Sequence, residues 1–144
     1  MGNRIVISDL DGTLSDPTRR LRLYKKGDYK AFNKAGKEDK PIENVCNMVR
    51  GLKDSETDIV VITARDESCR EDTIEWLRLY DVPCDKLLMR GCKDDRPDAD
   101  VKRDLFNENL NFSDVWFVLE DRTVCVDMWR GEGLTCLQVA PGDF

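Results

Sequence analysis

The residues with the clearest chemical potential are two aspartates near the start of the chain, separated by one leucine. Asp9 and Asp11 follow the apolar run Arg4–Ser8 and precede Gly12, which allows the backbone to turn tightly. A carboxylate in such a place can attack phosphorus and form an aspartyl phosphate. A second carboxylate two residues later can protonate the leaving oxygen and then activate water. At this spacing Asp9 can serve as a nucleophile and Asp11 as its acid/base partner.

A second pair of acids, Glu120 and Asp121, directly follows another apolar run at 115–119. Clustered carboxylates repel one another unless a cation binds between them, and a site rich in oxygen ligands suits Mg²⁺. We therefore expect a magnesium site made by Asp9, Asp11, Glu120 and Asp121. Because Mg²⁺ commonly binds together with phosphate groups, this expectation agrees with phosphoryl transfer at Asp9.

Two further side chains can act on a phosphoryl group. Thr63 ends the apolar run at 58–63, and Lys102 follows later in the chain; both can hold phosphoryl oxygens and neutralise their charge. The chain contains no histidine, which excludes Ser-His-Asp and Cys-His catalysis. Its six cysteines form no Cys-x-x-Cys pair, which argues against zinc. Most have apolar neighbours and are interpreted as core residues in a reducing compartment.

The elements that must position these residues alternate along the chain. Short apolar runs predict strands at Arg4–Ser8, 58–63, 86–89, 115–119 and 135–139. Apolar residues at helical spacing lie between them, at 42–52, 69–80, 101–110 and 123–130. This pattern is typical of an α/β, doubly wound, Rossmann-like fold with a five-stranded parallel sheet. Ligands bind beyond the carboxyl ends of such strands, where the acids and Thr63 are expected to converge.

We interpret the 144 residues as one domain with a small insertion after the first strand. The polar stretch at about 15–40 is too long for a simple loop, and we expect it to be partly helical around 28–37. Residues 19–40 contain nine Lys or Arg and three Asp or Glu, a balance of +6 in a chain of net charge −6. This basic stretch is either a solvated surface or an electrostatic guide for a nucleic-acid backbone. No apolar window is long enough to span a membrane, and the chain start lacks a signal-peptide pattern, so we expect a cytoplasmic protein.

The segment from Asp9 to Thr13 resembles the DxDGT signature of the haloacid dehalogenase-like phosphatases. Thr63, Lys102 and the pair at 120–121 follow in the order of the other motifs of that family. The resemblance implies Mg²⁺ as cofactor. The fourth motif reads Glu-Asp rather than Asp-Asp, so we expect Asp121 to bind Mg²⁺ directly and Glu120 through water.

A closer resemblance is to the 3′-phosphatase half of phage polynucleotide kinase. It is carried by the segments 63–65 (TAR), 98–102 (DADVK), 120–122 (EDR) and 133–144 (GLTCLQVAPGDF). It implies removal of a 3′-phosphate from nucleic-acid ends and adds four substrate-binding residues: Arg20, Arg65, Asp98 and Arg122. Arg20 and Arg65 would contact phosphate or backbone, and Asp98, one helical turn before Lys102, would orient that lysine. No GxxxxGK[ST] loop occurs, so kinase activity is not expected.

Two other functions stay open at this point. The chain could act on free nucleotides or another small phosphomonoester, or it could be a non-catalytic module that binds nucleic-acid ends. The intact Asp9 and Asp11 pair argues against the second, because binding alone does not need a carboxylate beside a phosphate. DNA and RNA both stay open as substrates, and the sequence does not define an oligomeric state.

Overall fold

A sheet of five parallel strands forms the centre of the molecule in the computed structural model, which describes residues 3–143. The strand order is β5-β4-β1-β6-β7. The strands are β1 (Arg4–Ser8), β4 (Thr57–Asp66), β5 (Lys86–Arg90), β6 (Val115–Glu120) and β7 (Cys136–Gln138). All five predicted strands are present, which confirms the doubly wound α/β fold. β4 is longer than predicted and continues through Asp66, which brings Arg65 onto the strand.

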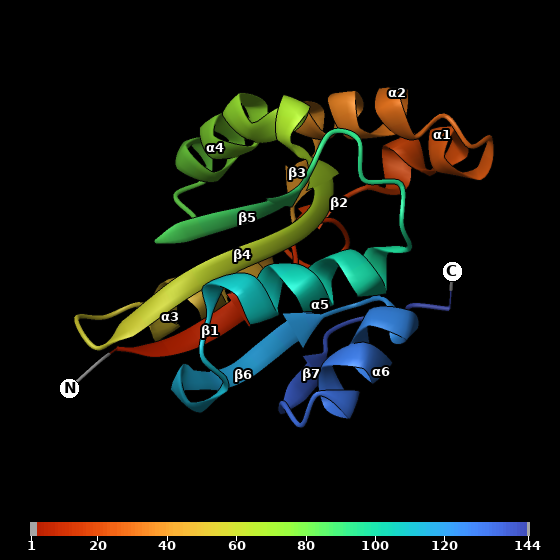
Figure 1. The fold of residues 1–144 in the computed structure, drawn as a ribbon. Helices are drawn as coiled ribbons and strands as arrows, with labels where there is room; N and C mark the ends of the chain where they lie inside the picture. The colour runs from red at the N-terminus through yellow and green to blue at the C-terminus, as the bar shows by residue number, and fades with distance from the viewer. Residues whose placement is uncertain (1–2, 144) are drawn as a thin grey trace.

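Helices cover both faces of the sheet (Figure 1). α3 (Glu43–Leu52) and α4 (Arg70–Leu79) pack on one face, and α5 (Asp98–Asn109) and α6 (Thr123–Gly131) pack on the other. Short 3₁₀ turns, η3 (Glu67–Cys69) and η4 (Phe112–Asp114), precede α4 and β6. All four helices lie close to the positions that helical spacing predicted.

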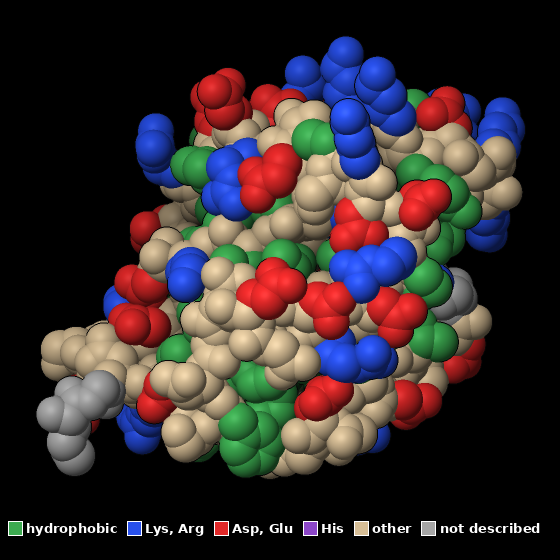
Figure 2. Space-filling model, viewed as in Figure 1, with side chains coloured by type: hydrophobic (Ala, Val, Ile, Leu, Met, Phe, Trp, Pro, Cys, Tyr) green, Lys and Arg blue, Asp and Glu red, His purple; other side chains and the backbone are tan. Residues whose placement is uncertain are grey.

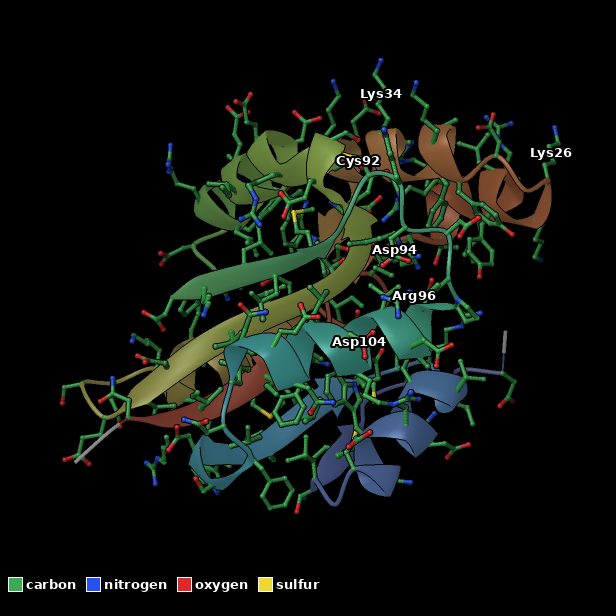
Figure 3. All side chains as sticks on the ribbon, in the orientation of Figure 1. Lys26, Lys34, Cys92, Asp94, Arg96 and Asp104 are labelled. Carbon is green, nitrogen blue, oxygen red and sulfur yellow. The ribbon has the colours of Figure 1, made fainter. Side chains whose placement is uncertain are left out.

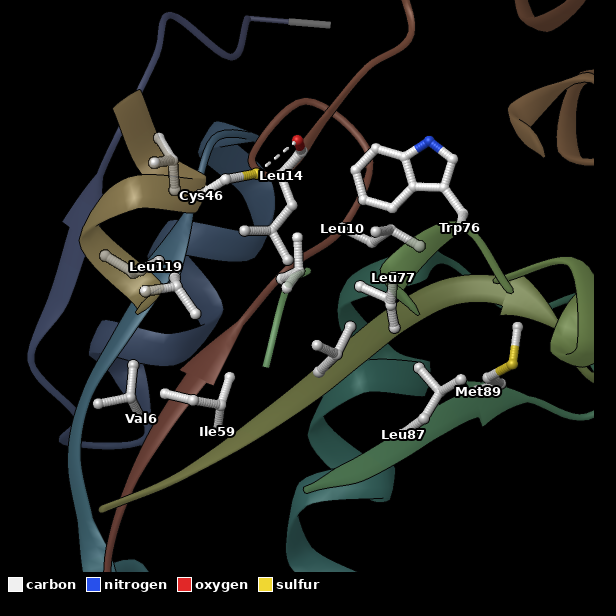
Figure 4. Close-up of a cluster of buried hydrophobic side chains, with 14 of the residues drawn as sticks. Val6, Leu10, Leu14, Cys46, Ile59, Trp76, Leu77, Leu87, Met89 and Leu119 are labelled. Carbon is white, nitrogen blue, oxygen red and sulfur yellow. Dashed lines mark hydrogen bonds between the residues drawn. The ribbon is translucent and has the colours of Figure 1, made fainter. Parts of the chain in front are cut away.

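Successive side chains of each strand point to opposite faces of the sheet and so divide the core into two layers. Val6 points toward α3 and α4, whereas the next residue, Ile7, points toward α5 and α6. Figure 4 shows the first layer, in which Trp76 of α4 and Cys46 of α3 pack against the strands. Burial of each aliphatic side chain in these layers stabilises the folded state by about 1.5–3 kcal/mol. Both faces of the sheet are therefore sealed, and only its edges and strand ends remain for chemistry.

The chain reverses its direction of travel across the sheet at β1. It builds β4 and β5 on one side of β1, then crosses over through α5 to place β6 and β7 on the other side. The carboxyl ends of β1 and β6 are joined by a backbone hydrogen bond of 2.9 Å from Asp9 N to Leu119 O. A crevice forms at such a switch point, because the loops leaving the two strands run in opposite directions.

The segment between β1 and α3 carries what we call the helical insertion, residues 17–39. Its base is closed by a short antiparallel pair, β2 (Ser15–Asp16) and β3 (Lys40–Pro41). It contains η1 (Thr18–Arg20), α1 (Leu21–Lys25), α2 (Tyr29–Lys34) and η2 (Ala35–Glu38). α2 and η2 coincide with the helix expected around 28–37, whereas α1 was not predicted. The insertion stands above the carboxyl end of the sheet (Figure 1).

Two simpler expectations can be compared with the described residues. Among them, no helix has both the length and the apolar character needed to cross a membrane. All six cysteines are unpaired thiols; four of them, Cys46, Cys69, Cys125 and Cys136, are buried.

Candidate active site

A cavity of about 950 Å³ opens where β1, β4 and β6 end. Nine of the ten residues singled out in the sequence line it, although they are spread over more than 110 positions of the chain. They are Asp9, Asp11, Thr63, Arg65, Asp98, Lys102, Glu120, Asp121 and Arg122. Arg20, the tenth, is fully buried behind the wall. The fold thus brings the predicted residues together at the switch point of the sheet.

Asp9 lies at the centre of this group and is 5% exposed. Its Oδ1 accepts a hydrogen bond of 2.8 Å from Lys102 Nζ, and its Oδ2 accepts one of 3.0 Å from Thr13 Oγ1. The same hydroxyl lies 3.2 Å from Oδ1 of Asp121. Thr13 therefore ties the loop after β1 to the loop after β6. The sequence reasoning missed this role, although Thr13 stands inside the motif that carried the prediction.

Asp9, Glu120 and Asp121 form a buried acidic group whose ligand oxygens lie within 4.8 Å of one another. Burial, together with the charge of Asp9, raises the pKa of Glu120 to about 7 and that of Asp121 to about 9. One ammonium group, that of Lys102, faces three carboxylates. A divalent cation would relieve this repulsion, and hard oxygen donors are the set that Mg²⁺ selects. The residues fit such an ion.

Lys102 links Asp9 to Glu120. Its Nζ donates 2.8 Å hydrogen bonds to Asp9 Oδ1 and to Glu120 Oε2. Burial alone would lower the pKa of Lys102, but the charges of Asp9 and Glu120 outweigh it and raise the pKa well above its ordinary value. The indole N–H of Trp129 also donates to Glu120 Oε2, at 3.3 Å. Glu120 is thus held by two donors on its side facing α5 and α6.

Gly12 allows the loop after β1 to approach Asp121. Its φ of +87° lies in the region that L side chains rarely adopt, and a Cβ placed on it would stand 2.1 Å from Asp121 Oδ2. A glycine is therefore required here both by the backbone conformation and by space.

Asp11 points away from the three acids and into a pair of arginines. Arg65 donates from Nε to its Oδ2 at 3.0 Å and from Nη2 to its Oδ1 at 2.6 Å, and Arg20 Nη2 also donates to Oδ1. Burial would raise the pKa of Asp11, but these two guanidinium groups overcome it and hold the pKa well below its usual range. Arg20 is fixed in turn by Asp39 of the helical insertion, through bonds of 2.7 to 3.1 Å.

This arrangement differs from what we expected of the two arginines. Arg20 and Arg65 were predicted to contact substrate, yet in the structure they are 0% and 2% exposed and both bind Asp11. The sequence could not indicate this, because β4 had to extend past Thr63 before Arg65 could reach Asp11. Asp39, the buried acid that completes the cluster, was also missed.

Asp98 likewise has other partners than the one predicted. It was expected to orient Lys102 from one helical turn away, but its Oδ2 accepts from Arg122 at 2.7 Å and its Oδ1 from Arg90. Lys102 is oriented by Asp9 and Glu120 instead. Asp98 begins α5, where a helix N-terminus favours a negative charge.

Arg90 is a further residue that the sequence reasoning missed. Besides Asp98, it binds the carbonyl oxygens of Ala64, Asp94 and Arg96, at 2.7 to 2.9 Å. It thereby fixes the loop at 91–97, which joins β5 to α5 and forms one side of the cavity. Figure 3 shows Cys92 and Asp94 on this loop, with Arg96 near the start of α5. Its position in the sequence could have indicated this role, because Arg90 lies at the carboxyl end of a strand, where the site is located.

The fold and this acidic site define the class to which the chain belongs. It has the haloacid dehalogenase-like fold: a hydrolase of that family from Streptococcus pneumoniae matches with a TM-score of 0.67 at 16% identity, over 94% of this chain and 84% of that chain. The class C acid phosphatase from Bacillus anthracis matches with a TM-score of 0.67 at 14% identity, over 99% of this chain and 67% of its own. At these identities the likeness concerns the fold alone.

Within that class, the family described as the polynucleotide kinase PNKP phosphatase domain matches residues 3–144. The chain belongs to this family and is a haloacid dehalogenase-like phosphatase. A chain in the structure of the Pnkp1/Rnl/Hen1 complex matches with a TM-score of 0.86 at 34% identity, over 99% of this chain and 48% of that chain.

A viral relative is similar over part of its length. The "Putative bifunctional polynucleotide kinase/RNA ligase" of Autographa californica nuclear polyhedrosis virus is 31% identical over 130 residues, which are 88% of this chain and 18% of that protein. The chain thus spans less than half the length of these two relatives.

Proposed function

We propose that the protein is a Mg²⁺-dependent phosphomonoesterase that removes 3′-phosphates from polynucleotide ends through an aspartyl phosphate on Asp9. The observation that carries the proposal is the setting of Asp9, whose carboxylate is aligned by Lys102 and Thr13 beside the acidic pair of β6. Membership in the polynucleotide kinase phosphatase family supports the substrate. So does the name of a structural relative, the Pnkp1/Rnl/Hen1 RNA repair complex.

In the first step, an Asp9 carboxylate oxygen attacks phosphorus, the bond from phosphorus to the 3′-oxygen breaks, and Asp11 protonates that oxygen. In the second step, water attacks the phospho-aspartate while Asp11 accepts a proton, which releases inorganic phosphate and restores Asp9. Lys102 and Thr63 neutralise and hold the phosphoryl oxygens. Asp9, the backbone carbonyl of Asp11 and Asp121 would hold Mg²⁺, with Glu120 beside them, and the ion would supply charge neutralisation.

The arginines around Asp11 fit this cycle. In the free protein they keep Asp11 ionised, which suits its role as a base. An incoming phosphate brings negative charge next to Asp11 and competes for Arg65, which lines the cavity. Both effects raise the pKa of Asp11 and favour the protonated form that the first step needs. Arg122, held by Asp98 on the cavity wall, is a further contact for the phosphate or the strand.

The test is phosphate release from a panel of substrates with Mg²⁺ or with EDTA. The panel contains 3′-phosphate DNA, 3′-phosphate RNA, 5′-phosphate oligonucleotides and 3′-mononucleotides. We expect Mg²⁺-dependent release that prefers 3′-phosphate oligonucleotides, with a preference that weakens as salt rises. Equal turnover of mononucleotides would support the small-molecule alternative, and no release from any substrate would support a binding module.

The nucleophile is tested by Asp9→Asn, which should lose turnover and keep its fold. Asp127→Asn, an exposed carboxylate on α6, is the matched control and should behave as wild type. Substantial turnover by purified Asp9→Asn protein would overturn the assignment.

A further inference from the structure

The helical insertion presents a row of aromatic rings to the same cavity. Tyr24, Tyr29 and Phe32 all line it. The ring centroid of Tyr24 is 5.2 Å from that of Tyr29 and 5.3 Å from that of Phe32. Phe32 is buried, Tyr24 is half-buried and Tyr29 is 57% exposed, so the row runs from the interior to the cavity mouth. We propose that this row is a nucleobase subsite, in which the exposed ring of Tyr29 stacks on the terminal base of the substrate.

The row contacts two arginines of the candidate active site. The guanidinium carbon of Arg20 lies 4.1 Å from the centroid of Phe32, and Arg20 binds Asp11. The guanidinium carbon of Arg122 lies 5.8 Å from the centroid of Tyr24. Tyr24 and Arg122 therefore adjoin on the cavity wall, and Arg20 supports Phe32 from behind it. A nucleotide whose 3′-phosphate reaches Asp9 has its sugar and base on the path along this wall.

Exposure and position together point to a planar ligand. A single exposed apolar side chain is ordinary on a protein surface. Here, however, the exposed ring belongs to a cluster of three on the wall of a cavity that ends at a phosphate site. Aromatic rings stack on any base, because every base has a π-face, and contribute about 1–3 kcal/mol per base. Such a subsite accepts all four bases, as an end-processing enzyme requires.

The polar residues beside the rings fit the rest of a nucleotide. Lys30 and Asn33 of α2 also line the cavity, and they offer an ammonium for a backbone phosphate and an amide for a base edge or sugar hydroxyl. By contrast, Lys26 and Lys34 do not line the cavity and stand on the outer surface of the insertion (Figure 3). The insertion thus turns rings inward and most of its lysines outward.

The experiment compares two substrates that differ only in the terminal base. One is an oligonucleotide with a normal 3′-terminal nucleotide and a 3′-phosphate, and the other ends in an abasic sugar with a 3′-phosphate. The readout is the ratio of kcat/KM between them. We expect the wild type to prefer the base by about tenfold, equivalent to about 1.4 kcal/mol. Tyr29→Ala should reduce the ratio to near one, and Tyr29→Phe, which retains the ring, should preserve it.

Phe112→Ala is the matched control, because Phe112 is 55% exposed and does not line the cavity. It should keep the wild-type ratio, so that loss of any exposed ring is not mistaken for loss of the subsite. An unchanged ratio in Tyr29→Ala, or a wild type that does not distinguish the two ends, would overturn the proposal.

The subsite rests on the proposed function, and a calorimetric titration separates the two. With Asp9→Asn protein in Mg²⁺, where turnover is blocked, the base-containing end should bind about tenfold more tightly than the abasic end. The added substitution Tyr29→Ala should remove the difference. If the wild type releases no phosphate from oligonucleotides but this difference appears, the proposed function fails and the subsite stands. If phosphate is released but no difference appears, the subsite fails alone.

Discussion

The acidic group and the helical insertion lie on the same cavity but are built in opposite ways. The acidic group, Asp9, Glu120 and Asp121, is at most 5% exposed. Its residues lie at the ends of two adjacent strands, which are joined there by a backbone hydrogen bond. The insertion is made of helices of five and six residues, and most of its charged side chains are exposed. Figure 2 shows its blue lysines and arginines gathered along the top of the molecule.

The difference separates two tasks. Strand pairing fixes the distances between the groups that, under the proposed function, act on one phosphorus atom. Short helices on a base of two-residue strands are a less rigid support. Under the proposed function, the strand ends would carry out the transfer of phosphate and the insertion would select the molecule that presents it. Arg20, which binds Asp39 within the insertion and Asp11 in the loop after β1, joins the insertion to the end of that strand.

The largest effect should come from removing the lysine that binds the acidic group. Lys102→Met removes the one ammonium that faces three carboxylates. We expect kcat/KM to fall about 1,000-fold, because the phosphoryl charge is no longer neutralised. Stability without cation should fall by about 3–5 kcal/mol, because buried charges lose their partner.

Thermal unfolding with and without Mg²⁺ checks this result. The variant should gain more from Mg²⁺ than the wild type does, since the ion now replaces a missing positive charge. Lys86→Met, at an exposed position on β5, should match the wild type. An equal response to Mg²⁺ in Lys102→Met and wild type would contradict an ion bound among these carboxylates.

A smaller effect is expected where the loop after β1 meets Asp121. Gly12→Ala places a Cβ at 2.1 Å from Asp121 Oδ2 and must displace that carboxylate. Misplacement by about 1 Å can cost about 100-fold in rate, and the positive φ adds about 1–3 kcal/mol of strain. Steady-state kinetics measures the loss of rate, and denaturant unfolding measures the loss of stability.

Gly51→Ala in α3 is the control for this substitution, because a Cβ there would meet nothing within 4 Å. It should leave activity unchanged and stability equal or slightly higher. If Gly12→Ala kept full activity, the rigid contact between the two loops would not matter for catalysis.

The smallest effect is expected on the outer surface of the insertion. Reversing two outward lysines, in Lys26→Glu with Lys34→Glu, should lower kcat/KM on a long 3′-phosphate oligonucleotide about threefold at low salt, through weaker long-range attraction. The loss should vanish near 0.5 M salt, where screening is strong, and should be absent for a 3′-mononucleotide. A loss that persists at high salt would place these lysines in direct contact with substrate.

The two regions also differed in how far the sequence could predict them. The strands and the four covering helices followed from apolar spacing, and the convergence of Asp9, Thr63, Lys102 and the acids at 120–121 followed from strand ends meeting at one edge. Side-chain pairing did not follow. Asp98 faces two arginines rather than Lys102, because the loop at 91–97 returns the chain so that Asp98, at the start of α5, lies beside Arg90 at the end of β5 and beside Arg122.

The insertion was the least predictable part. Its positive charge was visible in the sequence, but which side chains turn inward depends on how α1 and α2 pack, and α1 is too short to leave a periodic signal. Tyr24 and Tyr29 therefore gave no sequence signal of a common surface. The family resemblance singled out Arg20 as a substrate contact, but only tertiary packing gives it the buried partners Asp11 and Asp39.

The indole of Trp129 has a consequence for how the protein can be observed. It is 1% exposed and hydrogen-bonded to Glu120, directly beneath the acidic group. The other two tryptophans have different surroundings: the indole of Trp76 donates to the backbone of Asp39, and Trp116 is 44% exposed. With those two replaced by phenylalanine, the tryptophan emission of the protein would arise from Trp129 alone, and a cation bound beside Glu120 would change the electrostatic surroundings of its hydrogen-bond partner. The molecule thus carries an indole placed to report optically on the state of its acidic group.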